Sequence, residues 1–300
     1  MLVENKSKKH RIAREWILVL GSMFVLILSC NGRTVQDTRN PPIPGFPLRI
    51  EVPGVSENGI FDTALVEDET GKIWMSYSEV TFSAFAPKLI LVQTRIAVSA
   101  DDGVTWEDRG LIHRAETVTL PPPNQDAPAV WEQEVARLIF NPYAPASQRW
   151  QILWHRYLRI YDLDQDAAVP LFEHGWIAWK GAPAPGGPWL RERKLFSGSI
   201  YNEVNNSDAL GEPEYRLDQL FPAGLGDCLV FTEPGALVTP EGPYISLKCP
   251  TGAEGGKIVL LRCTHNLQTC DYRGNFLSDK DASSLYNSQF NGFSASEMLR

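Results

Sequence analysis

A chain of 300 residues is long enough for one large domain or two small ones. Its 9 tryptophans, 22 prolines and 23 glycines, together with the lack of helical apolar spacing after the N-terminus, favour a turn-rich, mostly β protein. The formal net charge is -8, and because the first 29 residues carry +3, the remainder carries about -11. An acidic body without a basic stripe argues against a nucleic acid as the partner.

Residues 1–29 predict an export signal. A basic segment, KSKKHRIAR, precedes the thirteen-residue run WILVLGSMFVLIL, which is too short to span a bilayer and is typical of a signal-peptide core. The run ends in ILSC, which resembles the lipobox of bacterial lipoproteins. The resemblance implies that Cys30 is lipidated and anchors the chain at the outer membrane or cell surface. The alternative is an ordinary signal peptide with a chance cysteine.

A proline-rich stretch follows Cys30. Residues 30–47 are therefore expected to be the lipidated cysteine and an extended linker, which leaves 48–300 as the folded domain. Within this domain three segments near 61–112, 131–197 and 231–277 share one layout. In each, an acidic residue leads into a small-apolar strand, a turn and an aromatic-rich strand. Each segment holds about four short strands, the size of a propeller blade.

The segment SADDGVTW fits the pattern Ser-x-Asp-x-Gly-x-Thr-Trp. The pattern predicts a hairpin turn in which the aspartate accepts backbone N–H bonds, the glycine takes a positive φ and the tryptophan packs on the sheet. A degenerate copy, LRCTHNLQTCDYRG, follows at a fixed offset of 164 positions. The residues of the first turn are Ser99, Asp101, Gly103, Thr105 and Trp106.

This turn resembles the Asp-box of sialidases and related β-propellers. The resemblance implies an all-β propeller of five or six blades, in which the Asp-box is structural and lies far from the active centre. Since a propeller needs at least four blades to close, the chain is expected to be incomplete at its C-terminus, where FSASEMLR would begin another innermost strand. A β-sandwich with similar hairpins is the alternative.

Export permits disulfides, and four cysteines remain once Cys30 is set aside. Cys263 and Cys270 take the Ser and Trp positions of the degenerate turn, so a disulfide between them would close it. Cys228 and Cys249 flank a predicted hairpin and are expected to pair across its ends. Metal binding is the competing interpretation, but the cysteines form no C-x-x-C pair and no histidine cluster lies near them, so no metal site is expected.

Acidic residues stand at the predicted innermost strand of each segment: Asp62, Glu134 and Glu233. Glycoside hydrolysis needs one ionised carboxylate and one protonated carboxylic acid. FDTALVEDETGKIWMSYS and FTEPGALVTPEGPYISLK resemble the inner-strand motifs of five-bladed glycosidases of the arabinanase and β-xylosidase type. This resemblance implies that Asp62 is the base, Glu233 the acid and Glu134 the residue that tunes and orients the acid. Glu132 competes with Glu134 for that place.

The register of these strands leaves one question open. When Ala236 is matched to Ala64, Glu233 falls one step away from Asp62, which would change the face on which it lies. Capping of turns at strand entry is the structural alternative for all three acids. Sialidase activity is not expected, because Phe61-Asp62-Thr63 stands where sialidases place the arginine that binds the substrate carboxylate.

Three further residues are candidate sugar contacts: His155, Trp131 and Arg137. His155 could bond sugar hydroxyls and Trp131 could stack on a sugar face, although packing within a blade is the common role of such residues. The sequence thus predicts an exported, monomeric glycoside hydrolase with a carbohydrate substrate and no cofactor. The alternatives are a non-catalytic carbohydrate- or protein-binding surface lipoprotein and an inactive, truncated propeller.

Overall fold

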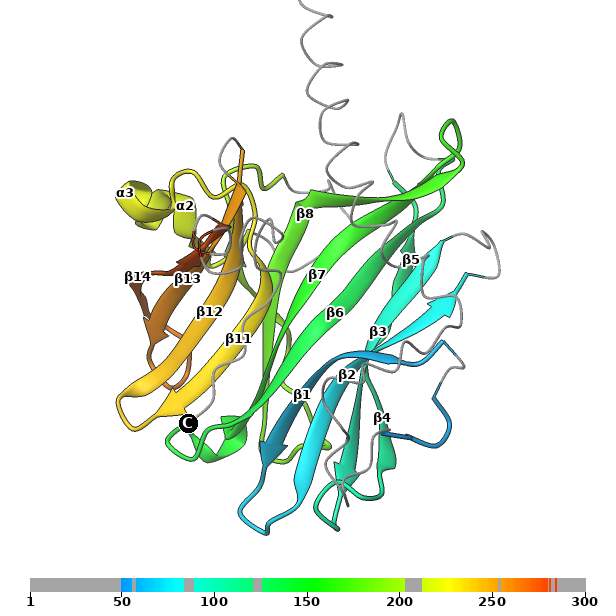
Figure 1. Ribbon diagram of the computed structural model, residues 1–300, viewed down its shortest axis with the longest axis vertical. Coiled ribbons are helices and arrows are strands. Elements are labelled where there is room, and N and C mark those ends of the chain that lie inside the picture. The colour runs from blue at the N-terminus through cyan, green and yellow to red at the C-terminus, as the bar shows by residue number, and fades with distance from the viewer. Residues whose placement is uncertain are drawn as a thin grey trace, which may run out of the picture. The chain divides into compact units, whose positions relative to one another are not determined.

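The computed structural model describes residues 50–55, 58–83, 89–120, 126–202, 212–252, 255–279, 281 and 284. The expected export signal, the lipidation site Cys30, its linker and the strand expected at 293–300 lie outside the described residues. The described part is almost entirely β and forms three sheets, whose strands follow one another in chain order (Figure 1). This agrees with the all-β class expected from composition.

The first sheet is an antiparallel meander. Its strands are β1 (Ile60–Glu67), β2 (Ile73–Phe82), β3 (Ile90–Ser99) and β4 (Glu107–His113). Asp68 forms the turn between β1 and β2, because its Oδ1 accepts the backbone N–H groups of Thr70 at 2.8 Å and Lys72 at 3.1 Å. Its Oδ2 accepts the indole N–H of Trp74, so the turn is also tied to β2.

Ser99–Trp106 connect β3 to β4. Asp101 accepts the Thr105 backbone N–H at 2.8 Å and its hydroxyl at 2.6 Å, while Ser99 accepts the Gly103 N–H at 2.8 Å. Gly103 has a φ of 85°, which suits glycine, and the Trp106 indole donates to the Gly103 carbonyl. Trp106 is buried against the sheet. The polar atoms of this turn therefore bond to one another.

The second sheet has six strands in the order β10-β9-β8-β7-β6-β5, rather than the expected four. They are β5 (Glu116–Val118), β6 (Ala129–Phe140), β7 (Trp150–Asp162), β8 (Ala167–Ala182), β9 (Arg193–Ser197) and β10 (Tyr215–Arg216). A 3-10 turn, η1 (Ala146–Gln148), joins β6 to β7. The two additional strands are short segments at the sheet edges, and β10 pairs parallel to β9. The central strands bury Trp154, Trp176 and Trp179 completely.

Two short helices precede the third sheet. The elements are α2 (Leu217–Leu220), α3 (Pro222–Leu225), β11 (Thr232–Thr239), β12 (Gly242–Thr251), β13 (Gly255–Cys263) and β14 (Cys270–Ser278). Both expected disulfides are present: Cys228–Cys249 ties the segment before β11 to β12, and Cys263–Cys270 closes the turn between β13 and β14. Disulfides are typical of proteins in oxidising compartments.

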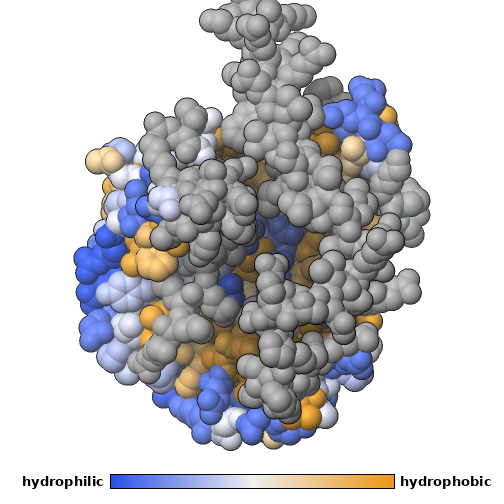
Figure 2. All heavy atoms as spheres, in the orientation of Figure 1, coloured by the Kyte–Doolittle hydropathy of each residue, from blue (hydrophilic) through white to orange (hydrophobic). Residues whose placement is uncertain are grey.

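The first and third sheets each pack against the second sheet, and β6 takes part in both junctions. β6 contacts β1, β2 and β3 of the first sheet and β11 of the third (Figure 1). Apolar clusters fill both junctions, with Ile96 and Trp150 between the first and second sheets, and Trp179 and Leu261 between the second and third. On the face in Figure 2, hydrophilic residues gather at the left and upper right margins of the described part, and both hydrophobic and hydrophilic residues are visible toward its middle.

The sheets correspond closely to the three segments expected from the sequence, but a closed ring is not formed by the residues described. The propeller of five or six blades therefore stays a prediction. None of the helices in the described ranges is long and apolar enough to cross a membrane.

Candidate active site

One strand of each sheet carries a bulge: β1, β6 and β11. Pairing with the following strand shifts between Phe61 and Ala64 in β1, between Glu134 and Arg137 in β6, and between Thr232 and Gly235 in β11. In each bulge one residue has a left-handed backbone. These residues are Asp62 (φ 51°), Val135 (φ 53°) and Glu233 (φ 51°). Such conformations cost about 1–3 kcal/mol in non-glycine residues and concentrate at functional sites.

The bulges correct the register expected from the sequence. Ala64 corresponds to Gly235, not to Ala236, because each of the two residues resumes pairing directly after its bulge. Asp62 and Glu233 therefore occupy equivalent positions, and the one-step offset expected between them is absent. The match of Ala236 to Ala64 takes no account of pairing with the next strand, which sets the register.

Glu134 sits one residue before the left-handed position of its strand, which Val135 occupies. Val135 is held there by two features of the neighbouring sheet. Its N–H donates to the Ser78 hydroxyl at 3.1 Å, and the following carbonyl, of Ala136, accepts the Ser76 hydroxyl at 2.8 Å. The same Ser78 hydroxyl bonds the Asp62 carboxylate. Ser78 therefore links the bulge of β6 to the acid on β1.

Arg137 connects the three bulges. It lies on β6, and its Nε donates to the Pro234 carbonyl at 3.0 Å while its Nη1 reaches the Thr63 carbonyl at 3.4 Å. Thr63 and Pro234 directly follow the acids Asp62 and Glu233 in the chain. The guanidinium thus lies among the three strands, and its positive charge opposes the rise that burial causes in the pKa of both acids. The sequence analysis predicted that Arg137 contacts sugar. In the structure its guanidinium donates to backbone carbonyl groups on both neighbouring sheets.

The three predicted catalytic acids influence one another's pKa electrostatically. Burial raises the pKa of Glu233 to about 8, and the charges of Glu134 and Asp62 raise it further, whereas Lys248 and Arg137 oppose the rise. Burial, together with the Asp62 charge, raises the pKa of Glu134 to about 7. Asp62 is more exposed; burial raises its pKa, and the Ser78 hydrogen bond and Arg137 counteract this. Three carboxyl groups from three sheets therefore share one electrostatic environment.

A buried polar network lies behind Glu134. The Tyr157 hydroxyl bonds the Glu134 carboxylate and accepts from Arg159 Nη2 at 2.6 Å. Arg159 Nε in turn donates to Glu132 Oε1 at 3.0 Å, and the other Glu132 oxygen accepts the Val92 N–H. Glu132 is completely buried, whereas Glu134 is half-buried. Glu132 thus belongs to the supporting network, and Glu134 is the glutamate that interacts with the other two acids.

Sequence reasoning overlooked Tyr157, Arg159 and Ser78. A signal for the first two was present, because His155, Tyr157 and Arg159 alternate along β7 and therefore share one face with period two. Ser78 had no comparable signal: its place beside Asp62 depends on the bulge in β1.

The other two nominated sugar contacts are buried. His155 is opposite Glu134 in the sheet, is 1% exposed and packs against Tyr157 and Phe172. Burial lowers its pKa to about 3, so the ring is neutral, and its Nε2 has no partner within the part of the chain that the structure describes. Trp131 is 3% exposed and packs against Trp176. Neither ring presents an open face in this structure, so their contact with sugar stays a prediction.

No protein-family model and no curated protein sequence matches the chain. Among solved structures, a thermostable family-43 glycoside hydrolase is similar over 73% of this chain and 53% of its own length, with 14% identity and a TM-score of 0.37. A family-43 arabinoxylan arabinofuranohydrolase from Bacillus subtilis, in complex with cellotetraose, aligns over 80% of this chain and 56% of its own length, with 13% identity and a TM-score of 0.34.

An α-L-arabinanase from Cellvibrio cellulosa, complexed with arabinohexaose, aligns over 80% of this chain and 81% of its own, with 12% identity and a TM-score of 0.29. The chain spans about half the length of the first of these hydrolases. These similarities are too distant to assign the chain to a family.

Proposed function

We propose that the chain is a glycoside hydrolase in which Glu233 is the general acid, Asp62 the general base and Glu134 the residue that tunes the acid, on three sheets that are blades of a β-propeller. One observation carries the proposal: three carboxyl groups from three sheets interact at matching bulges, and one of them, Glu233, has a pKa raised to about 8. A carboxylic acid that remains protonated at neutral pH beside more readily ionised carboxylates is what glycoside hydrolysis requires.

In this mechanism Glu233 donates its proton to the glycosidic oxygen as the bond from that oxygen to the anomeric carbon breaks. Asp62 removes a proton from a water molecule, whose oxygen forms the new bond to the anomeric carbon. The Ser78 hydrogen bond and Arg137 favour the ionised form of Asp62 that this role needs. The charge of Glu134 favours the protonated form of Glu233, and Tyr157 orients Glu134.

The test is hydrolysis by the purified full chain of arabinohexaose, cellotetraose and β-1,3-galactotriose, the oligosaccharides named with solved hydrolases of similar structure. Products are separated by chromatography. Asp62→Asn and Glu233→Gln each should lower the rate about 10²- to 10⁴-fold, the usual contribution of a general acid or base. Glu67→Gln is the matched control, because Glu67 is an exposed carboxylate at the other end of β1.

Release of product by the wild type and by Glu67→Gln, with loss in both site variants, is the expected result. Cleavage that persists unchanged in Asp62→Asn and Glu233→Gln would contradict the assignment. Saturable binding of any of the three sugars without product would favour the non-catalytic binding protein instead.

A further inference from the structure

In the first sheet a serine of β2 lies opposite the bulge that carries Asp62. Ser78 pairs with Phe61, the last residue to pair before the bulge, and its hydroxyl bonds the Asp62 carboxylate. Paired residues of antiparallel strands share one face, whereas successive residues of a regular strand lie on opposite faces. Asp62 directly follows Phe61 in the chain, yet it reaches Ser78. The bulge therefore turns the acid toward the face of the residue opposite.

The third sheet repeats this arrangement with a different side chain. Thr232 is the last residue of β11 to pair before the bulge, and its partner on β12 is Lys248. Glu233 follows Thr232 and has the same φ of 51° as Asp62. Lys248 thus occupies the place of Ser78, and the same turn of the backbone directs Glu233 toward it. In agreement, the positive charge of Lys248 opposes the rise that burial causes in the pKa of Glu233.

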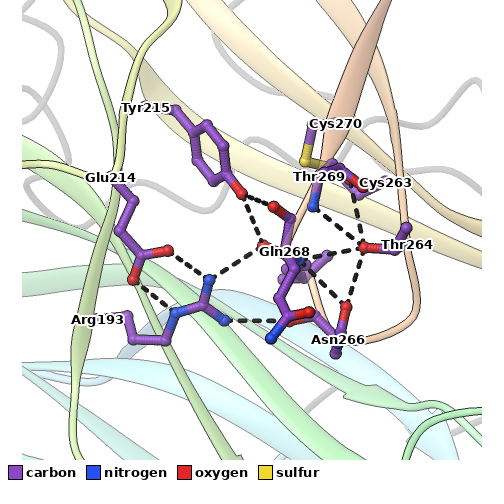
Figure 3. Close-up of polar contacts among 10 residues, drawn as sticks. Arg193, Glu214, Tyr215, Cys263, Thr264, Asn266, Gln268, Thr269 and Cys270 are labelled. Carbon is purple, nitrogen blue, oxygen red and sulfur yellow. Dashed lines mark hydrogen bonds and ion pairs between the residues drawn. A yellow bond between two sulfur atoms is a disulfide. The ribbon is translucent and has the colours of Figure 1, made fainter.

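The third sheet is held against the second at the turn that follows β13. Arg193, on β9, donates to the carbonyls of Asn266 at 3.0 Å and Leu267 at 3.1 Å in that turn (Figure 3). The Cys263–Cys270 disulfide closes the same turn (Figure 3). β11 also packs against β6. The third sheet and its acid are therefore held in place relative to the second sheet.

Lys248 differs from the other cation that acts on Glu233. The Arg137 guanidinium donates to two backbone carbonyls, whereas the Lys248 ammonium makes no hydrogen bond or ion pair with the residues that the structure describes. Lys248 is half-buried, so its charge is less screened than that of an exposed lysine. The negative charges that act on Glu233 are those of Glu134 and Asp62. An ammonium group on a flexible stem is suited to pair with a carboxylate that forms beside it.

We propose that Lys248 is a positioning residue that pairs with the Glu233 carboxylate once Glu233 has given its proton to the leaving group. That Glu233 is the proton donor rests on the proposed function. The O–H bond of Glu233 breaks, its proton passes to the glycosidic oxygen, and that oxygen keeps the electron pair of its bond to the anomeric carbon. The negative charge left on Glu233 is paired with the Lys248 ammonium. A proton from water restores Glu233, and Asp62 returns to water the proton that it removed.

The test that needs no activity is the titration of Glu233 by ¹³C NMR in the full chain. Glutamate is labelled at Cδ, and the Glu233 signal is assigned by its loss in Glu233→Gln. Lys248→Met removes the charge, so the titration midpoint should rise by about one pH unit, the lower end of the effect of an adjacent opposite charge. Lys248→Arg keeps the charge and should leave the midpoint close to that of the wild type. Lys72→Met is the matched control, because Lys72 is exposed between β1 and β2.

Hydrolysis gives a second readout. Lys248→Met should lower kcat up to about tenfold with little change in KM, since one pKa unit corresponds to a factor of ten and the negative charge appears only as the proton leaves. The alkaline limb of kcat/KM should move to higher pH. The loss should vanish on a dinitrophenyl glycoside, whose leaving group needs no proton. A distorted site would slow the cleavage of both kinds of substrate.

An unchanged titration midpoint in Lys248→Met overturns the proposal, as does an equal loss of rate on both kinds of substrate. Hydrolysis by the wild type together with an unchanged midpoint contradicts only the role of Lys248. A raised midpoint in a chain that hydrolyses no glycan supports the pairing and contradicts only the proposed function. If Lys248→Met does not fold, Lys248→Gln takes its place, because the amide keeps a polar group there without the charge.

Discussion

Asp62 and Glu233 share one backbone conformation, a φ of 51° in each, at matching bulges in the first and third sheets. Their surroundings differ although their positions correspond. Asp62 is exposed and bonded by Ser78, whereas Glu233 is half-buried and is influenced by the charges of both other acids. Two equivalent carboxyl groups therefore acquire different proton affinities, which is the difference that the proposed roles of acid and base require.

The pH dependence of catalysis should show the raised pKa of Glu233. Because Glu233 must be protonated to act as the acid and its pKa is about 8, kcat/KM should fall above about pH 8. Glu134→Gln removes a negative charge that raises this pKa, so the alkaline limb should move to lower pH. The measurement is a pH profile of kcat/KM for the wild type, Glu134→Gln and Glu67→Gln. An alkaline limb at the same pH in Glu134→Gln would refute the electrostatic coupling.

The free energy of unfolding should also depend on pH through Glu233. Between the ordinary glutamate pKa of 4.5 and about 8, the unfolded chain has lost the Glu233 proton while the folded chain retains it. The stability of the wild type should therefore fall as the pH rises through this range. The glutamine of Glu233→Gln cannot lose a proton. The melting temperature of this variant, relative to that of the wild type, should therefore rise by a few degrees between pH 5 and pH 8. A constant difference in melting temperature across that range contradicts the raised pKa.

Arg137 should matter to the fold as well as to the acids. Arg137→Met removes hydrogen bonds to the Pro234 and Thr63 carbonyls, and we expect it to cost about 1–3 kcal/mol of unfolding free energy. It also removes a positive charge that lowers the pKa of Asp62, so the acid limb of activity should move to higher pH. Urea denaturation and the pH profile measure the two effects. Arg109→Met is the control, since Arg109 forms only an exposed pair with Glu107 among the described residues.

The two disulfides should contribute unequally to the free energy of unfolding. Cys228–Cys249 spans 21 positions and Cys263–Cys270 spans 7, so loop-closure entropy predicts losses of about 3 and about 2 kcal/mol when each pair is replaced by alanine. Urea denaturation of the two double variants gives the values directly. The opposite order, with the shorter loop costing more, would mean that the turn at Cys263 stabilises the sheet by more than chain closure.

The sequence anticipated the strands, because period-two patterns and turn residues are local properties. It also anticipated the cysteine pairs, since each flanks one hairpin or one turn. The bulges were missed because an extra residue in a strand leaves no mark in apolar alternation, and with them the equivalence of Asp62 and Glu233 was missed. The place of Ser78 beside Asp62 depends on the bulge in β1, and the place of Tyr157 beside Glu134 depends on the pairing of β6 with β7, neither of which a single strand encodes.

The dependence of cleavage on the leaving group tests the role of Glu233 most directly. The rates of the wild type and Glu233→Gln are compared on two glycosides of the sugar that the chain hydrolyses, one with a dinitrophenyl and one with a methyl leaving group. The dinitrophenolate departs without a proton, whereas the alkoxide needs one. We predict that Glu233→Gln cleaves the dinitrophenyl glycoside at close to the wild-type rate and loses about 10²- to 10⁴-fold on the methyl glycoside. Equal losses on both substrates would contradict Glu233 as the general acid.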